Sequence, residues 1–311
     1  MAAEITNESI IPVVSIIMVT YNHEQFISEA IEGCLMQKTD FPVELVVADD
    51  ASSDGTQTII GQYANNYPGF VKPILRSINI GANPNWLDAV NKCQGRYIAI
   101  CEGDDYWTDP HKLQKQVDFM DQNSDYSFCF HNVDVLLMDN EVKFAEPFTT
   151  LPDNPVTFRD VVTGNFIPTA SVIFRNMIDS FPEWFSHVSS GDRALFGLLA
   201  LRGNGYYIPD KMAVYRKHLA GMSEVPSDSF DVKINNSRRK LILYEGLSKA
   251  SGRRYSAVLS PIIAGFYWGI MINGFRAGRI LTGVKSLIMV FRYDFLLVIR
   301  KAGKVLRGVF I

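Results

Sequence analysis

Three carboxylates lie within the run Glu102-Gly103-Asp104-Asp105, which follows directly on the apolar residues 95–101. A short apolar run bounded by glycine is typical of a core strand in a parallel sheet. Open α/β sheets bind ligands at the carboxyl ends of their strands. Carboxylates packed there repel one another, and a divalent cation would stabilise them. A solvated turn is the alternative, because Gly and Asp also favour turns.

Two earlier apolar runs end in the same polar way. Residues 13–19 lead into Thr20-Tyr21-Asn22-His23, and residues 43–48 lead into Asp49-Asp50-Ala51-Ser52-Ser53-Asp54-Gly55-Thr56. A helical spacing of apolar residues follows each run, and Ser53 or Asp54 is the expected cap of the second helix. This alternation predicts right-handed crossovers and a parallel sheet, with three polar strand ends on one rim where a nucleotide would lie.

The sequence has no glycine-rich phosphate loop. The turn after the first strand lacks the G-x-G-x-x-G fingerprint, and no Walker lysine loop occurs. A divalent cation on Asp104 or Asp105 would hold a diphosphate instead, because it bridges phosphate oxygens and neutralises their charge.

Several motifs together resemble the inverting, GT-A-type family 2 glycosyltransferases of bacteria, in their non-processive form. They are the three strand ends above, the loop Asn79-Ile80-Gly81 between the second helix and the next strand, Gly191-Asp192-Arg193, and Val214-Tyr215-Arg216-Lys217-His218. The resemblance covers roughly residues 12–223 in the expected order. It implies a Rossmann-like, mostly parallel sheet flanked by helices. It also implies a catalytic domain over residues 10–230 and a basic, apolar helical region over residues 231–311.

The resemblance assigns roles to the residues on the rim. It implies that Asp50 accepts a uracil N–H with Thr20 and Tyr21 beside it, that Asp104 contacts ribose or metal, and that Asp105 is a metal ligand. It further implies that His218 binds metal or diphosphate from the far side of the site. The full set expected to bind nucleotide-sugar is Thr20, Tyr21, Asn22, Asp50, Asn79 and Asp104.

Asp192 precedes an apolar-faced helix pattern and would suit the N-cap position. The resemblance implies that it is also the general base, and a carboxylate at a helix N-terminus stays ionised as a base must. Gly191 stands where family members have Glu, so a second acidic helper is in doubt.

The expected activity is inverting transfer of a sugar from a nucleotide-diphospho-sugar, with a UDP-sugar favoured. The acceptor would be a hydroxyl of a glycan or lipid-linked glycan in cell-surface polysaccharide biosynthesis, and Mn²⁺ or Mg²⁺ would be required. A nucleotidyltransferase would want a basic, glycine-rich N-terminal loop, which is missing. A non-catalytic sugar- or lipid-binding protein would not need the acidic residues that match the family pattern.

Composition favours a reduced, cytoplasmic protein. Apolar residues make up 47% of the chain, and the four cysteines form no C-x-x-C pair. The first nine residues are mostly polar and acidic, so no secretory signal is expected.

Charge is concentrated at the C-terminus. Residues 251–311 contain ten basic residues and one aspartate, although the whole chain has a net charge of −3. Basic segments rich in Phe, Trp and Leu favour the surface of an anionic membrane, here the inner face of the bacterial inner membrane. A small helical hairpin with solvated arginines is the alternative. The uncharged residues 255–275 approach spanning length but contain Pro and Gly, and no nucleic-acid motif accompanies the charge.

Overall fold

The computed structural model describes residues 11–138, 143–145, 153–164, 166–177, 180–218 and 229–300. The chain forms two compact units. The first takes its residues from 1–160, 164–180 and 202–221, and the second from 161–163, 181–201 and 222–311. Residues 181–201 thus group with the C-terminal helices, whereas the sequence analysis assigned them to the catalytic domain.

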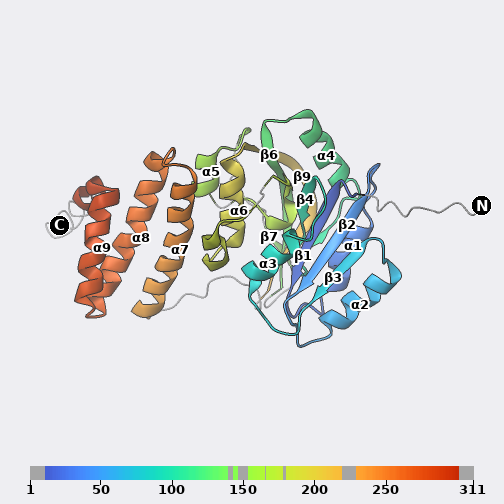
Figure 1. Cartoon of the computed structure of the whole chain (residues 1–311), viewed down its shortest axis with the longest axis horizontal. Helices are drawn as coiled ribbons and strands as arrows, with labels where there is room; N and C mark the ends of the chain where they lie inside the picture. Colours follow the sequence, from blue (N-terminus) through green and yellow to red (C-terminus); the bar gives the residue numbers. More distant parts are fainter. Residues whose placement is uncertain are drawn as a thin grey trace, which may run out of the picture. The chain divides into compact units, whose positions relative to one another are not determined.

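The first unit is built around one sheet. Its elements are β1 (Val14–Thr20), α1 (Ile27–Leu35), β2 (Val43–Asp49), α2 (Thr56–Asn66), β3 (Val71–Leu75), α3 (Ala82–Val90), β4 (Tyr97–Ile100), β5 (Tyr106–Trp107), α4 (Lys112–Gln122), β6 (Tyr126–Leu137), β7 (Lys143–Ala145), the 3₁₀ turn η1 (Thr169–Ser171), β8 (Ile173–Arg175) and β9 (Asn204–Lys217). Within the described residues the strand order is β3-β2-β1-β4-β8-β6-β9-β5, with β7 paired to β6 (Figure 1).

The predicted parallel arrangement is confirmed for β3, β2, β1 and β4, which pair in parallel with one another in that order. Thr20 pairs with Asp49 at the ends of β1 and β2, so these two polar strand ends lie on one rim. Beyond β4 the sheet becomes mixed, because β8 pairs antiparallel with both β4 and β6. The sheet continues through β9, which pairs parallel with β6 and antiparallel with β5.

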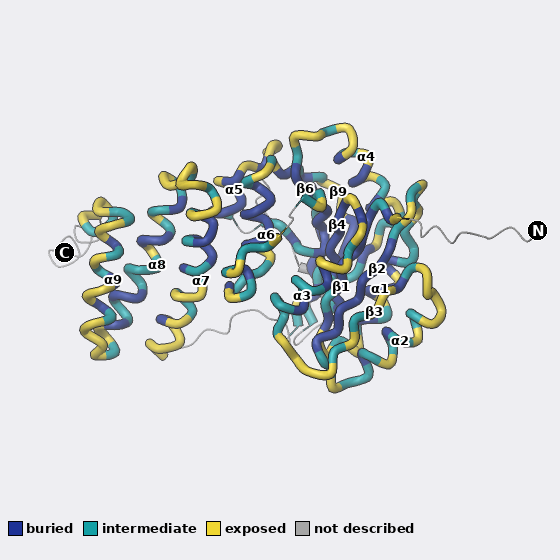
Figure 2. Tube along the Cα trace, in the orientation of Figure 1, coloured by how far each residue is buried: buried dark blue, intermediate teal, exposed yellow. Residues whose placement is uncertain are grey.

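Both faces of the central strands are covered. In β1, Ile16 and Met18 join the core cluster that includes Ile27 and Ile31 of α1, while Ile17 points to the opposite face and is equally buried. Figure 2 shows these strands as a buried layer. Burial on both faces explains why the sequence of these strands is continuously apolar. A sheet with one face exposed to solvent would have alternating apolar and polar residues instead.

Two elements were missed by the sequence analysis. Strand β3 and helix α3 lie between α2 and β4, so the loop Asn79-Ile80-Gly81 joins β3 to α3 rather than the second helix to a strand. Each contains a proline in a tolerated position. Pro73 lies in an edge strand, where a missing N–H need not break the sheet. Pro84 lies in the first turn of α3, where N–H groups have no intrahelical partner.

The second unit is helical. Its elements are the 3₁₀ turn η2 (Glu183–His187), α6 (Gly191–Ala200), α7 (Phe230–Ala250), α8 (Ser256–Arg276) and α9 (Ile280–Tyr293), and the short helix α5 (Phe158–Thr163) runs from the first unit into it. Helix α8 continues to Arg276, and Gly278 then adopts a φ of 70° in the short turn before α9. By length and composition α8 could cross a membrane, and 33% of its apolar window is buried inside the protein.

Gly95 gives a test of the strand packing. A Cβ on this residue would lie 2.5 Å from the backbone nitrogen of Ser15 and 2.8 Å from the carbonyl oxygen of Tyr97. We expect Gly95→Ala to lower the free energy of unfolding by about 1–3 kcal/mol, as overpacking does. Gly61→Ala is the matched control, because nothing lies within 4 Å of its Cβ in α2. It should be neutral or stabilising by up to about 1 kcal/mol. Urea unfolding followed by circular dichroism distinguishes the two, and equal midpoints would contradict the packing.

Candidate active site

The acidic loop after β4 is held against the end of β1. The N–H of Cys101 donates to the carbonyl of Ile17 at 3.0 Å, and the N–H of Gly103 donates to that of Val19 at 3.0 Å. Gly103 passes so close to β1 that a Cβ would lie 2.7 Å from Thr20 Oγ1. The loop therefore needs glycine at this position, and its carboxylates are brought to the rim on which β1 ends.

Three side chains from three segments meet at this rim: His23, Asp104 and His218. One potential ligand atom from each lies within 4.8 Å of the others. His218 Nε2 is 3.1 Å from Asp104 Oδ2, and His23 Nε2 is 3.8 Å from the same oxygen. The ring of His218 also packs on Phe26 at 4.9 Å between centroids, which fixes its position.

The protonation states of this cluster suit a divalent cation. Burial lowers the pKa of His23, so its imidazole is neutral near pH 7. Burial alone would raise the pKa of Asp104, but the hydrogen bond with His218 and the nearby His23 outweigh it and the pKa is lowered. A neutral imidazole and an ionised carboxylate are the forms that bind metals.

The ligand types discriminate between the two expected metals. His23 Nδ1 is buried without a hydrogen-bond partner among the described residues, and Nε2 is the ring nitrogen that lies 3.8 Å from Asp104 Oδ2. Two of the three ligands are imidazoles, which are typical ligands of transition-metal ions, whereas Mg²⁺ prefers oxygen ligands. Of the two expected ions, only Mn²⁺ is a transition metal, and these residues fit Mg²⁺ less well.

Asp105, the metal ligand expected from the sequence, lies outside this cluster. Its side chain is buried, and its Oδ1 accepts the backbone N–H of Arg216 at 2.8 Å. Burial, together with the charges of Asp104 and Glu102, raises its pKa well above the usual range. The contacts of Asp105 are thus those of a residue that joins the acidic loop to β9.

Arg216 completes this junction. Its guanidinium donates to the carbonyl of Asp104 at 2.7 Å and forms an ion pair with Glu29. The same group stacks 4.3 Å from the ring centroid of Tyr106. Although the sequence analysis quoted Arg216 only as part of a motif, this buried cation ties α1, the acidic loop and β9 together.

Asp50 is bonded to the neighbouring loop. Its two carboxylate oxygens accept the N–H groups of Ile80 and Gly81, at 2.8 and 2.9 Å, and the side-chain amide of Asn79 donates to its carbonyl at 2.9 Å. The structure therefore brings Asp50 and Asn79 together. It also shows that Asp50 orders the loop that follows β3.

The residues after β1 differ in exposure. Thr20 is buried and its Oγ1 has no hydrogen-bond partner, whereas Tyr21 is 47% exposed. Asn22 has a φ of 56°, and its Oδ1 accepts the N–H of Ser53 at 2.8 Å. The exposed ring of Tyr21 is therefore accessible and can cover a planar ligand. The side chain of Asn22 instead stabilises the turn that contains Ser53.

Asp192 belongs to the second unit. Helix α6 begins at Gly191 with Ser190 as its N-cap, so Asp192 lies in the first turn rather than at the expected cap. Its side chain is exposed. An exposed carboxylate in a first helical turn interacts favourably with the helix dipole.

His23 is the main residue that the sequence analysis missed. It directly follows Thr20-Tyr21-Asn22, so its place at the rim was predictable, but its pairing with a residue 195 positions later was not. His131 lies outside this cluster and is fully buried, with Nδ1 2.7 Å from the carbonyl oxygen of Asn132.

Comparisons with known proteins identify the family. Residues 15–181, more than half of the chain, match the family model for glycosyl transferase family 2. An uncharacterized protein of Mycobacterium tuberculosis is 42% identical over 218 residues, which are 67% of this chain and 60% of that protein. The Escherichia coli UDP-Glc:alpha-D-GlcNAc-diphosphoundecaprenol beta-1,3-glucosyltransferase WfgD is 30% identical over 176 residues, 56% of this chain and 65% of that enzyme. The chain thus spans less than two thirds of the length of these relatives.

Solved structures share the fold. S. aureus TarS in complex with UDP-GlcNAc aligns with a TM-score of 0.55 at 20% identity, covering 88% of this chain and 90% of that one. Mannosyltransferase PcManGT from Pyrobaculum calidifontis, in complex with GDP-Man and Mn²⁺, aligns with a TM-score of 0.53 at 16% identity, covering 95% and 81%. The α/β fold expected from the sequence is confirmed, and the chain belongs to glycosyl transferase family 2.

Proposed function

We propose that this protein transfers a sugar, with inversion, from a nucleotide-diphospho-sugar to a hydroxyl of a glycan or lipid-linked glycan. The observation that carries the proposal is the His23, Asp104 and His218 cluster on the rim where β1 and β4 end. A UDP-sugar is the favoured donor, because the loop around Asp50 offers polar groups for a base and a UDP-GlcNAc complex is known for TarS. WfgD and the Bacillus subtilis TuaG, named for teichuronic acid biosynthesis, support a role in cell-surface polysaccharides.

Different residues of the rim would bind different parts of the donor. The exposed ring of Tyr21 is available to stack on the base, and Asp50 with Asn79 fixes the loop beside it. His23, Asp104 and His218 would hold Mn²⁺ near the diphosphate. The bound cation would supply charge neutralisation that makes the nucleotide diphosphate a better leaving group.

Asp192 is the proposed general base. It would accept the proton of the acceptor hydroxyl as that oxygen attacks the anomeric carbon on the side opposite the diphosphate. One displacement of this kind inverts the configuration, so an α-linked donor gives a β-glycoside. Its exposure and its place in the first turn of α6 support the assignment, because the step requires a carboxylate that an acceptor hydroxyl can reach.

The proposed location is the cytoplasmic side of the bacterial inner membrane, with peripheral attachment through the C-terminal region. The four cysteines are free, which suits a reducing compartment. The basic C-terminal residues suit an anionic lipid surface.

A screen of nucleotide-sugars for nucleotide release, with Mn²⁺ or with chelator, tests the proposal directly. We expect release from at least one UDP-sugar that increases with an acceptor glycan and disappears on chelation. Full turnover in excess chelator by a metal-free preparation would refute the metal assignment. Absence of release from every nucleotide-sugar would refute the activity.

The identity of the metal-binding carboxylate gives a sharper prediction. Asp104→Asn should weaken Mn²⁺ binding by at least about 10–100-fold, the range observed even for outer-shell partners of a metal. Asp105→Asn should keep Mn²⁺ affinity within a few-fold, because a neutral isostere can still accept the N–H of Arg216. Mn²⁺ titration by calorimetry or electron paramagnetic resonance measures both. The reverse ranking would show that Asp105 is the ligand, as the sequence resemblance implied.

The base assignment is tested by Asp192→Asn. We expect turnover to fall by about 10²-fold or more while donor affinity stays close to that of the parent, the usual scale for a positioned base. Asp231→Asn is the matched control, since Asp231 is also an exposed aspartate in the first turn of a helix of the second unit. Turnover of the Asp192 variant near that of the control would leave Asp192 with only a helix-stabilising role.

A further inference from the structure

Helix α9 presents large apolar side chains to solvent. Five of them form what we call the apolar stripe: Ile280, Leu281, Val284, Ile288 and Phe291, which are 69%, 67%, 43%, 61% and 43% exposed. Their spacing of three, four and seven residues places them on one side of the helix. A helix of a water-soluble protein normally turns such a face to the core.

The opposite side of α9 packs against α8 through small residues. Gly283 and Ser286 are buried there together with Val290. A Cβ on Gly283 would lie 2.5 Å from the ring of Phe275, and a Cβ on Gly274 of α8 would lie 3.2 Å from the nitrogen of Gly283. The two helices therefore pack closely, and the apolar stripe is not needed for their contact.

Basic side chains flank the apolar stripe. Within residues 251–300 seven basic residues face one aspartate, and the ion pairs described for this region engage only Arg279 and Arg300. Lys285 and Arg292 lie beside the stripe on α9 and are exposed. Exposed apolar residues continue after the helix in Phe295, Leu296 and Ile299. Apolar residues bordered by cations are the pattern of a helix that lies on an anionic lipid surface.

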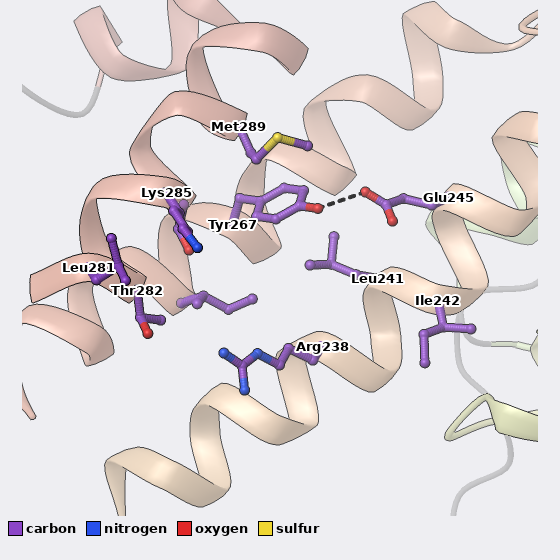
Figure 3. A pocket seen from close by; sticks show the side chains of 11 residues that line it. Arg238, Leu241, Ile242, Glu245, Tyr267, Leu281, Thr282, Lys285 and Met289 are labelled. Atoms are coloured by element: carbon purple, nitrogen blue, oxygen red, sulfur yellow. Dashed lines mark hydrogen bonds between the residues drawn. The ribbon is translucent and has the colours of Figure 1, made fainter. Parts of the chain in front are cut away.

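A pocket of about 420 Å³ opens between α7, α8 and α9, next to this face. Arg238 of α7 and Lys285 of α9 line it, and neither forms a hydrogen bond or ion pair with another described residue (Figure 3). The apolar side chains of Leu241 and Ile270 form part of the pocket wall. Leu281 and Lys285 line the pocket as well as the outer face of α9, so the pocket and the apolar stripe are continuous.

The carboxylate in this pocket is already occupied. Glu245 accepts the hydroxyls of Tyr267 at 2.8 Å and Tyr293 at 3.2 Å. Burial and the bond to Glu245 raise the pKa of Tyr267, and burial with the charge of Glu245 raises that of Tyr293, so both hydroxyls stay protonated donors. Arg238 and Lys285 therefore leave the pocket with a net positive charge, which suits an anionic head group beside an apolar tail.

We propose that α9 docks on an anionic phospholipid bilayer, with the apolar stripe in the boundary between head groups and acyl chains. The pocket between Arg238 and Lys285 takes the phosphate of one lipid. This inference rests on the proposed function only for the membrane location and not for glycosyl transfer. Helix α8 packs between α7 and α9, which favours attachment to one membrane face over insertion of α8 across it.

Co-sedimentation of the full chain with vesicles tests the docking. Vesicles of phosphatidylglycerol with phosphatidylcholine are compared with phosphatidylcholine alone, at low and high salt and without nucleotide-sugar. The stripe variant is Val284→Asn with Ile288→Asn, and the pocket variant is Arg238→Gln with Lys285→Gln. All four residues lie outside the proposed active site. Controls of the first unit are Ile11→Asn, at a residue that is 72% exposed, and Lys38→Gln with Lys92→Gln.

We expect binding to anionic vesicles only, reduced but not lost at high salt. The pocket variant should bind about 30-fold more weakly, since each cation near an anionic surface contributes about fivefold. The stripe variant should bind at least about tenfold more weakly, because two aliphatic side chains that would be buried in the bilayer are removed. The first-unit controls should bind like the parent.

Three results would overturn the proposal. They are no binding to anionic vesicles, equal binding by all variants, and a parent dimer in analytical ultracentrifugation that the stripe variant dissociates while vesicles remain unbound. The last result would make the apolar stripe an interface with a second copy of the chain. Because nucleotide release is measured without vesicles, failure of docking and failure of the proposed activity are distinguishable.

Discussion

The crowding of carboxylates at the end of β4 is the constraint on which the site depends. Glu102, Asp104 and Asp105 are too close to remain charged without compensation. The structure treats two of them differently. Asp104 lies against two imidazoles at the rim, while Asp105 is buried under the backbone of Arg216 and its pKa is raised. One acidic loop thus supplies a carboxylate to the candidate metal site and another that fixes the loop to β9.

The strands that end at the rim were predictable because burial on both faces leaves a clear apolar signal. Their polar ends, including Thr20, Asp50 and Asp104, were predicted to share one edge, and the register of β1 and β2 confirms this for the first two strand ends. The resemblance to family 2 glycosyltransferases supplied the expected roles of these residues. It assigned the metal to Asp105, whereas in the structure Asp104 lies against His218 and Asp105 accepts the N–H of Arg216. Contacts with such distant residues could not be predicted from the adjacent positions of the two aspartates in one loop.

Two kinds of feature escaped the sequence. Strand β3 contains Pro73 and helix α3 contains Pro84. Proline weakens the sequence signal for a strand or a helix, but it is tolerated at a sheet edge and in a first helical turn. The orientation of α9 could not be predicted from the sequence for a different reason. The basic charge of the C-terminal region was evident, but only packing through Gly283 shows which side of the helix faces its neighbour.

The two ends of the sheet have a consequence for the behaviour of the protein in solution. One edge is β3, interrupted by Pro73 and carrying exposed Lys72, and the other is β5, which has only two residues. Within the described residues, neither of these two strands offers a long run of free backbone groups on which a strand from another molecule could add. Both are therefore poor sites for strand addition. If molecules of this protein associate, their contacts should involve helices or loops, and concentrated samples should not form fibrils by strand addition.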